Sequence, residues 1–159
     1  MGTKKKYKLG KKEANGLHRV IALRSFGTVA KGEVGGFIEK EANLSHEGNA
    51  WVSGDARVYG DALVSGDALV SGDALVSGDA WVSGNAWVSG NARVYGDARV
   101  YGDARVYGNA LVYGDALVSG RFDVQCAIDF ELPRVTLSTT AQARQLRDFL
   151  VKLDKRVKS

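Results

Sequence analysis

A six-residue repeat constrains this chain more than any other feature of its sequence. A valine recurs at every sixth position from Val52 to Val118, and an alanine stands two residues before each of them. A period of six matches neither the 3.6 residues of a helical turn nor a heptad. Within each unit the order Ala-x-Val-y alternates, which places Ala and Val on one face of a short strand. The intervening Gly-Asp or Gly-Asn pair predicts a tight turn, because glycine allows positive φ.

Strands this short must stack on one another to bury their apolar face. A strand of about four residues with a two-residue corner has no core of its own, but successive coils of such units can stack into a continuous column. The composition agrees with many tight turns, since the chain has 20 glycines and 1 proline, with 45% apolar residues. We therefore expect an all-β solenoid with an interior of valine and alanine.

The repeat units, typified by "GDALVS", resemble those of the hexapeptide-repeat proteins over about residues 34–124. The resemblance implies a left-handed triangular parallel β-helix with three strands to a coil. Its handedness comes from the resemblance alone, because the general rule for parallel crossovers favours right-handed connections. The stretch "LHRVIALRSFGTVAKGEVGGFIEKEANLSHEGNAWV" also resembles the leader of bacterial and phage members labelled putative transferases, in which the leader caps the helix.

The chain divides into four segments. Residues 1–12 carry six lysines and predict a flexible basic tail, and residues 13–50 predict N-terminal capping strands and first irregular coils. Residues 51–120 hold the regular repeat, and "LSHEGNAWV" reaches Val52 with two extra residues, which predicts a bulged coil. Residues 121–159 predict irregular strands followed by an amphipathic α-helix that caps the open end or mediates oligomerisation.

The outward positions of the repeat carry large apolar side chains. If a coil takes eighteen residues, equivalent positions stack about 4.8 Å apart, and tryptophan and leucine then form exposed rows that a monomer rarely tolerates. The resemblance implies a homotrimer, and we expect a dimer or trimer, with a host protein as the other candidate partner. The predicted interface residues are Trp51, Leu63, Leu69, Trp81, Trp87, Phe149 and Leu153.

One coil carries an arginine and a tyrosine on each of its three strands. Interleaved Arg and aromatic side chains can bind nucleotides or single strands through charge and stacking. Asp97 and Asp103 lie in the same coil, and we expect them to pair with the arginines, so we favour a solvated face over a nucleic-acid site. The candidate anion-binding residues are Arg93, Tyr95, Arg99, Tyr101, Arg105 and Tyr107.

Four aspartates fall on one edge of the expected solenoid. Such a ladder of Asp61, Asp79, Asp97 and Asp115 has the ligand type that Ca²⁺ prefers. Asparagine replaces aspartate at the equivalent turn positions 85, 91 and 109, which favours a role in capping each turn. We therefore expect neither a metal site nor a cofactor.

The sequence offers one candidate for catalysis. The acyltransferases that the repeat resembles use a histidine as general base, and this chain has only His18 and His46. His46 lies in the predicted bulge, with Glu41 and Glu47 as its nearby carboxylates. No Gly-Lys-Ser/Thr phosphate loop, Cys/His metal cluster or G-x-S-x-G elbow is present.

The hypotheses for function are three. The first is a non-catalytic binding or scaffold protein, a phage or prophage accessory protein that binds and blocks a host defence component through its flat faces. The alternatives are a CoA-dependent acyltransferase using His46 and a nucleotide binder using the Arg/Tyr coil. The single Cys126 and the lack of a ~20-residue apolar run lead us to expect a cytoplasmic protein without a membrane anchor.

Overall fold

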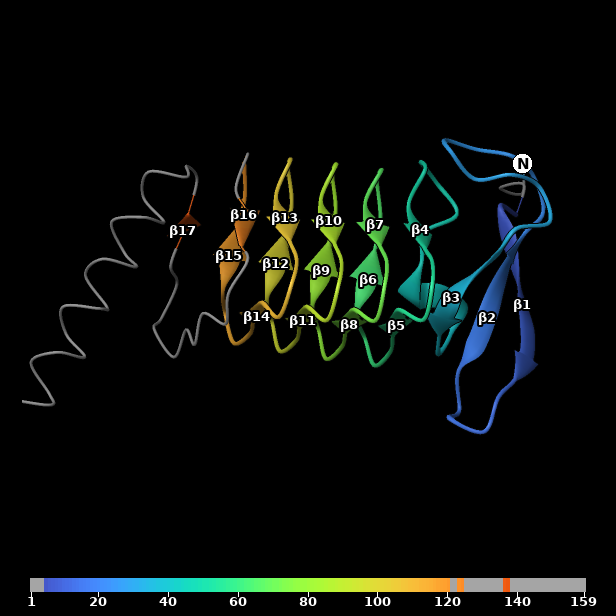
Figure 1. Ribbon diagram of the computed structural model, residues 1–159, viewed down its shortest axis with the longest axis horizontal. Coiled ribbons are helices and arrows are strands. Elements are labelled where there is room, and N and C mark those ends of the chain that lie inside the picture. Colours follow the sequence, from blue (N-terminus) through green and yellow to red (C-terminus); the bar gives the residue numbers. More distant parts are fainter. Residues whose placement is uncertain (1–4, 121–122, 125–135, 138–159) are drawn as a thin grey trace, which may run out of the picture.

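The computed structural model describes residues 5–120, 123–124 and 136–137, and nearly all their regular structure is β (Figure 1). The elements are β1 (Tyr7–Lys12), β2 (His18–Ala22), β3 (Val34–Ile38), the 3₁₀ helix η1 (Glu41–Asn43), β4 (Trp51–Val52), β5 (Arg57–Val58), β6 (Leu63–Val64), β7 (Leu69–Val70), β8 (Leu75–Val76), β9 (Trp81–Val82), β10 (Trp87–Val88), β11 (Arg93–Val94), β12 (Arg99–Val100), β13 (Arg105–Val106), β14 (Leu111–Val112), β15 (Leu117–Val118), β16 (Asp123–Val124) and β17 (Thr136–Leu137).

The strands of the repeat form three parallel sheets along a solenoid. Each strand pairs with the third strand after it, so that Trp51 of β4 lies beside Leu69 of β7, eighteen residues later. The sheet orders are β1-β2-β3-β5-β8-β11-β14, β16-β13-β10-β7-β4 and β17-β15-β12-β9-β6. We call them the leader sheet, the β10 sheet and the β9 sheet. Residues 5–50, which precede the regular coils, are called the leader. The coils stand side by side along the long axis (Figure 1). The predicted all-β parallel solenoid is therefore confirmed.

The interior is the predicted column of alanine and valine. Every repeat alanine from Ala50 to Ala116 and every repeat valine from Val52 to Val118 is at most 4% exposed. Burial of these side chains, at about 25 cal/mol for each Å² of apolar surface, is the main stabilising term of the repeat. Because each coil of a solenoid contacts only its neighbours, the stability of the column depends on the packing between successive coils.

The corners take part in the stacking. Gly66 has a φ of 67°, and a Cβ there would lie 3.0 Å from the Gly84 nitrogen of the next coil. The corner amide of Asp67 donates to the Gly84 carbonyl at 2.9 Å. Corner glycines therefore serve both the left-handed backbone and the close approach of coils.

Two corner asparagine side chains bond to the next coil and not to their own turns. The Asn85 amide donates to the Asp103 carboxylate at 3.0 Å, and the Asn49 amide donates to the Asp67 carboxylate at 2.8 Å. Both bonds join equivalent positions of neighbouring coils. The capping role expected from the sequence is therefore wrong for these pairs, because the eighteen-residue register brings the next corner within reach of an amide.

The bulge before the regular coils lies where the sequence predicts it. Phe37 of β3 pairs with Arg57 of β5, twenty residues later, and Leu44 bridges to Val64 over the same distance in sequence. The buried Asn43 lies one residue before this bridge, and its amide nitrogen donates to two carbonyls of the next coil. The step from Ile38 to Leu44 keeps the six-residue spacing, so the two extra residues lie between Leu44 and Val52.

The prediction of a flexible tail over residues 1–12 is wrong for its second half. Strand β1 pairs antiparallel with β2, which pairs antiparallel with β3, and β3 continues into the parallel sheet. Tyr7 is fully buried and Leu9 packs against the core. Three of the six lysines lie on this strand, which turns the apolar Tyr7 and Leu9 to one face. The predicted strand in "LHRVIALRSF" is confirmed over His18–Ala22.

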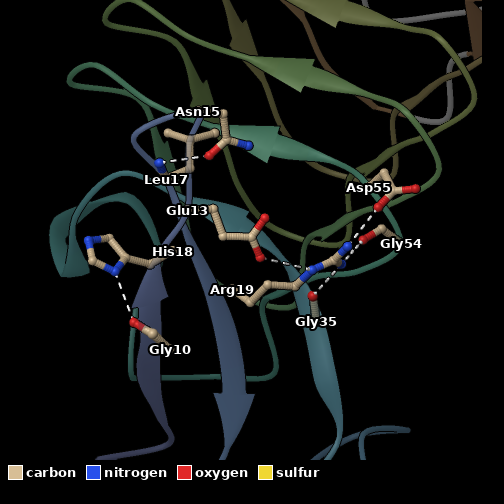
Figure 2. A network of polar contacts seen from close by, with 9 residues as sticks. All are labelled: Gly10, Glu13, Asn15, Leu17, His18, Arg19, Gly35, Gly54 and Asp55. Carbon is tan, nitrogen blue, oxygen red and sulfur yellow. Dashed lines mark hydrogen bonds and ion pairs between the residues drawn. The ribbon is translucent and has the colours of Figure 1, made fainter.

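Arg19 joins this hairpin to the first regular coil (Figure 2). Its guanidinium donates to the Gly35 carbonyl at 3.1 Å, to the Gly54 carbonyl at 2.8 Å and to the Asp55 carboxylate at 2.8 Å. The same group lies 3.9 Å from the centre of the Phe37 ring. One side chain of β2 therefore binds β3 and the first corner of the regular coils.

The C-terminal end of the chain is described only in part. Strands β16 and β17 extend two of the sheets. The predicted amphipathic helix, with Phe149 and Leu153, lies outside the described residues. Among the residues that are described, no helix has the length and apolar character needed to cross a membrane.

Candidate interaction surfaces

His46 lies in the bulge, as the sequence predicts, but its ring packs inward. The imidazole stacks on the Tyr7 ring with centroids 4.2 Å apart, and Nδ1 accepts a hydrogen bond from the Lys6 backbone N–H at 3.2 Å. Its Nε2 is buried and lies 3.8 Å from a carboxylate oxygen of Glu41. Burial lowers the pKa of His46, and the Glu41 carboxylate opposes this shift. The geometry is that of a packing residue that holds β1 against the bulge, with neither ring nitrogen open to a substrate.

Lys6 is the most unusual charged residue of the structure, because its side chain is fully buried. Its ammonium donates to the carbonyls of Ala50 at 2.9 Å and Gly48 at 3.3 Å, and lies 4.8 Å from the centre of the Phe26 ring. Burial, with the positive charge of Arg24, lowers the pKa of Lys6 to about 8. The lysine-rich start of the chain thus contains one residue that is part of the core.

Tyr7 completes this cluster from the next position of the chain. Its hydroxyl is 2.7 Å from the Leu44 carbonyl and 3.0 Å from the Glu41 carbonyl. Burial raises the pKa of Tyr7, and the Glu41 carboxylate adds to this shift. The hydrogen bonds of Lys6, Tyr7 and His46 join the start of β1 to the bulged coil, so we interpret the cluster as a structural cap.

The prediction that Trp51 belongs to an exposed surface is wrong. Trp51 is only 2% exposed, because the leader folds back over the first coil. Phe26 packs edge-on against its indole with centroids 5.4 Å apart, and Tyr7 does so at 6.5 Å. The outward position of this coil has therefore become part of the core.

The side chains of Trp81 and Trp87 are exposed to solvent, as predicted. Each is 43% exposed, and Leu69 is 37% exposed. The two tryptophans belong to consecutive strands, β9 and β10, and so lie on the two sheets that meet at one corner of the same coil. We call the surface formed by Leu63, Leu69, Trp81 and Trp87 the tryptophan edge.

Hydrogen bonds fix both indoles on the neighbouring coil. Trp81 Nε1 donates to Ser65 Oγ at 3.0 Å, and Trp87 Nε1 donates to Ser71 Oγ at 3.1 Å. Each indole therefore has its polar group satisfied within the protein and presents mainly its apolar ring. Ser65 and Ser71 therefore orient the two candidate interface residues.

The arginines of the Arg/Tyr coil do not converge on one site. Arg93, Arg99 and Arg105 lie on β11, β12 and β13, which belong to three different sheets. Within the described residues none of them forms an ion pair, so the expected pairing with Asp97 and Asp103 is wrong.

The neighbours of these arginines differ from sheet to sheet. The Arg105 guanidinium lies 5.9 Å from the centre of the Trp87 ring. Tyr95 stacks on Tyr113 of the next coil, with centroids 5.2 Å apart and an interplanar angle of 7°. Tyr101 is exposed and Tyr107 is half-buried. The three Arg-Tyr pairs are therefore separate surface features, and each sheet must be considered by itself.

The aspartate ladder is neutralised at its first position. The Lys40 ammonium contacts the Asp61 carboxylate at 2.6 Å, and this hydrogen bond lowers the pKa of Asp61. In the part of the chain that the structure describes, no three His, Cys, Asp or Glu side chains gather in a way that holds a metal ion.

The repeat is similar to one known family. Residues 56–72, 68–84, 86–102, 92–105, 98–112 and 104–120 match the family described as the YdcK beta solenoid repeat. The matched segments together cover residues 56–84 and 86–120 and lie within the regular coils. The chain is therefore a β-solenoid repeat protein, and the matched description names a fold without an activity. Comparison with curated proteins finds no match.

Proposed function

We propose that this chain is a non-catalytic β-solenoid that binds a protein partner through the tryptophan edge. The observation that carries the proposal is the pair of exposed indoles on adjacent sheets, each fixed by a serine. Tryptophan is the residue most often found at the energetic centre of protein interfaces. Rings held in place before binding lose little conformational entropy when they are covered. A left-handed triangular winding, which the resemblance implies, would place the two indoles on flat faces.

The chemistry of the edge indicates what its partner presents. Because both indole N–H groups already have acceptors, the centre of the partner surface needs apolar groups rather than carbonyls. Arg99 pairs with Trp81 and Arg105 with Trp87 in the strand register, and the Arg105 guanidinium lies 5.9 Å from the centre of the Trp87 ring. We propose a partner with an apolar centre and a carboxylate at the rim. The resemblance of the leader to phage proteins adds the finer proposal that this partner is a protein of the bacterial host.

Self-association through the same surface is the second proposal for the edge. A dimer or trimer that buries both indoles has a mass that analytical ultracentrifugation resolves from that of the 17.0 kDa monomer. Replacing both tryptophans (Trp81→Ser with Trp87→Ser) is expected to return the oligomer to monomer. A wild-type protein that sediments as a monomer overturns self-association and leaves the heterologous partner to be tested.

The heterologous partner is tested by cross-linking in bacterial lysate. The wild type and the control Leu111→Ser, which alters the leader sheet, are expected to capture the same protein. The double tryptophan variant is expected to capture at least tenfold less of this protein, measured as the mass recovered. Equal recovery with all three proteins contradicts the proposal, because the tryptophan edge then contributes nothing to capture.

The two alternatives make distinct predictions. An acyltransferase using His46 predicts that acetyl-CoA raises the melting temperature and that His46→Ala abolishes acyl transfer. A nucleotide binder using the Arg/Tyr coil predicts that Arg99→Glu or Tyr101→Ala removes nucleotide binding. Under our proposal acetyl-CoA leaves the melting temperature unchanged, because the half-buried ring of His46 packs on Tyr7 and its Nε2 is buried.

A further inference from the structure

A depression lies between the leader hairpin and the outward side of the leader sheet, away from the tryptophan edge. Its volume is about 380 Å³, within the range of sites for small ligands. The hairpin turn between β1 and β2 forms one wall, and β5 and β8 form the floor. The lining residues used below are Lys12, Leu17, Glu39, Arg57, Tyr59 and Leu75.

The lining combines positive charge with an apolar surface. Lys12 and Arg57 form no ion pair within the described residues. The carboxylate of Glu39 accepts a hydrogen bond from the Gly60 backbone N–H at 2.7 Å, so part of its acceptor capacity is used by the protein. With two cationic side chains and one carboxylate, the lining of the depression has a net positive charge. This charge favours the binding of an anionic ligand.

Tyr59 gives the depression a free aromatic ring. Its equivalent two coils later, Tyr95, stacks on Tyr113. The position one coil after Tyr59 is Ser77, which has no ring to stack. With Leu17 of the hairpin and Leu75 of the floor, Tyr59 offers a surface suited to a flat, apolar group.

The wall is held in place before any ligand arrives. Leu17 is buried, and the Arg19 guanidinium ties the hairpin to Gly35, Gly54 and Asp55 of the solenoid. Figure 2 shows Leu17 and Asn15 at the hairpin turn, beside strands of the solenoid. A preformed wall lowers the entropic cost of binding.

We propose that this depression binds a small organic anion that carries a flat ring, such as an aromatic carboxylate or a nucleoside monophosphate. The anion contacts Lys12 and Arg57, and the ring packs between Tyr59 and the two leucines. This site lies on a different sheet from the tryptophan edge. The proposed anion binding therefore does not depend on the proposed protein partner.

The test is a titration followed by backbone amide chemical shifts, with benzoate, AMP, adenosine and inorganic phosphate as separate probes. Benzoate or AMP is added up to ~10 mM, a concentration high enough to detect the millimolar dissociation constants of weak, open sites. Either ligand is expected to shift the amide resonances of Gly16, Leu17 and Tyr59. Adenosine and phosphate, which each lack one half of the ligand, are expected to bind at least about fivefold more weakly than AMP.

Two arginines provide the matched variants. Arg57 and Arg93 occupy equivalent exposed positions of the leader sheet, but only Arg57 lines the depression. Arg57→Ala is expected to weaken binding of the bound anion at least about fivefold, as for loss of a charged hydrogen bond, and Arg93→Ala to leave it within about twofold.

Three results overturn the proposal. They are the absence of shifts with benzoate and AMP, equal losses in the two arginine variants, and binding of phosphate or adenosine as tight as that of AMP. Unchanged unfolding curves of both variants establish that a loss of binding is not a loss of fold.

Discussion

The repeat and the leader build their cores in different ways. In the repeat, every coil places the same alanine and valine over those of the coil before it, and each of these side chains is at most 4% exposed. In the leader, each buried side chain has contacts of its own, such as the carbonyls bound by Lys6 and the hydroxyl contacts of Tyr7. The repeat is therefore tolerant at any one coil, whereas the leader depends on single residues. Substitutions of matched residues in the two regions can sharpen or break this comparison.

Among the glycine, polar and charged positions, the largest effect is expected at Gly35, where the leader touches the first coil. A Cβ at this position would lie 2.6 Å from Val20 Cγ2 and 2.7 Å from the Trp51 ring, and would also press on the Val52 carbonyl. We expect Gly35→Ala to lower the free energy of unfolding by about 3 kcal/mol or more, because neither backbone nor indole can move aside. Urea unfolding measures this loss.

Gly32→Ala is the control for that substitution. Gly32 has a φ of 87° but no atom within 4 Å of the added Cβ, so only the backbone strain of about 1 kcal/mol is expected. If the two variants lose equal stability, the close packing between leader and coil is not what stabilises this junction.

The next largest effect is expected from Asn43→Ala. The buried amide donates to the Gly60 carbonyl at 3.0 Å and the Ala62 carbonyl at 2.8 Å, and accepts from the Lys40 N–H at 2.9 Å. Its loss leaves buried backbone groups without partners, which costs about 2 kcal/mol or more. Asn91→Ala, which removes one exposed 3.3 Å contact between corners, is expected to cost less than ~0.5 kcal/mol. Similar losses in chemical unfolding would remove the distinction between the regions.

The buried lysine predicts a pH dependence that the repeat lacks. The pKa of Lys6 is lowered by burial from 10.5 to about 8, so between these values the unfolded chain binds more protons than the folded one. The free energy of unfolding should therefore rise with pH in this window, by on the order of 1 kcal/mol. Above pH 10 the raised pKa of Tyr7 acts in the opposite direction, since the folded state then keeps the proton.

Lys6→Met should abolish the rise between pH 8 and 10, although it also lowers stability at every pH by removing two hydrogen bonds. Lys8→Met, at an exposed position two residues later in β1, should retain it. Identical pH profiles of unfolding for the two variants would show that the Lys6 ammonium is not the group responsible.

The smallest effect is expected at a corner of the repeat. The Asp103 carboxylate is exposed and accepts one hydrogen bond from Asn85. An amide oxygen can accept the same bond, so Asp103→Asn should change the free energy of unfolding by less than ~0.5 kcal/mol. A loss above 1 kcal/mol in urea unfolding would mean that the corner carboxylates, and not the alanine-valine column, hold the coils in register.

The part of the fold that repeats was predictable from the sequence. The valine spacing indicates short strands that stack with a six-residue unit, and the two extra residues before Val52 indicate the longer coil. Both follow from periodicity, because a buried position must recur wherever the unit recurs, whereas the eighteen-residue coil was implied by the family resemblance.

The leader was not predictable in this way. Tyr7 and Lys6 stand in a lysine-rich stretch, and nothing local indicates that one ammonium is buried. Trp51 and Trp87 occupy equivalent positions of one sheet, yet one is covered and the other is open, because Phe26 of the leader reaches only the first coil. Contacts between segments far apart in sequence decide which side chains form the tryptophan edge.

The central claim is that the leader covers the first coil and leaves the same side chains of later coils as open surface. The unfolding free energies of Trp51→Ala and Trp87→Ala, measured side by side, test it most directly. We predict a loss of roughly 3–5 kcal/mol for Trp51→Ala, as for a buried tryptophan, and less than about 1 kcal/mol for the exposed Trp87. Equal losses would contradict the account, because the two indoles would then have equivalent surroundings.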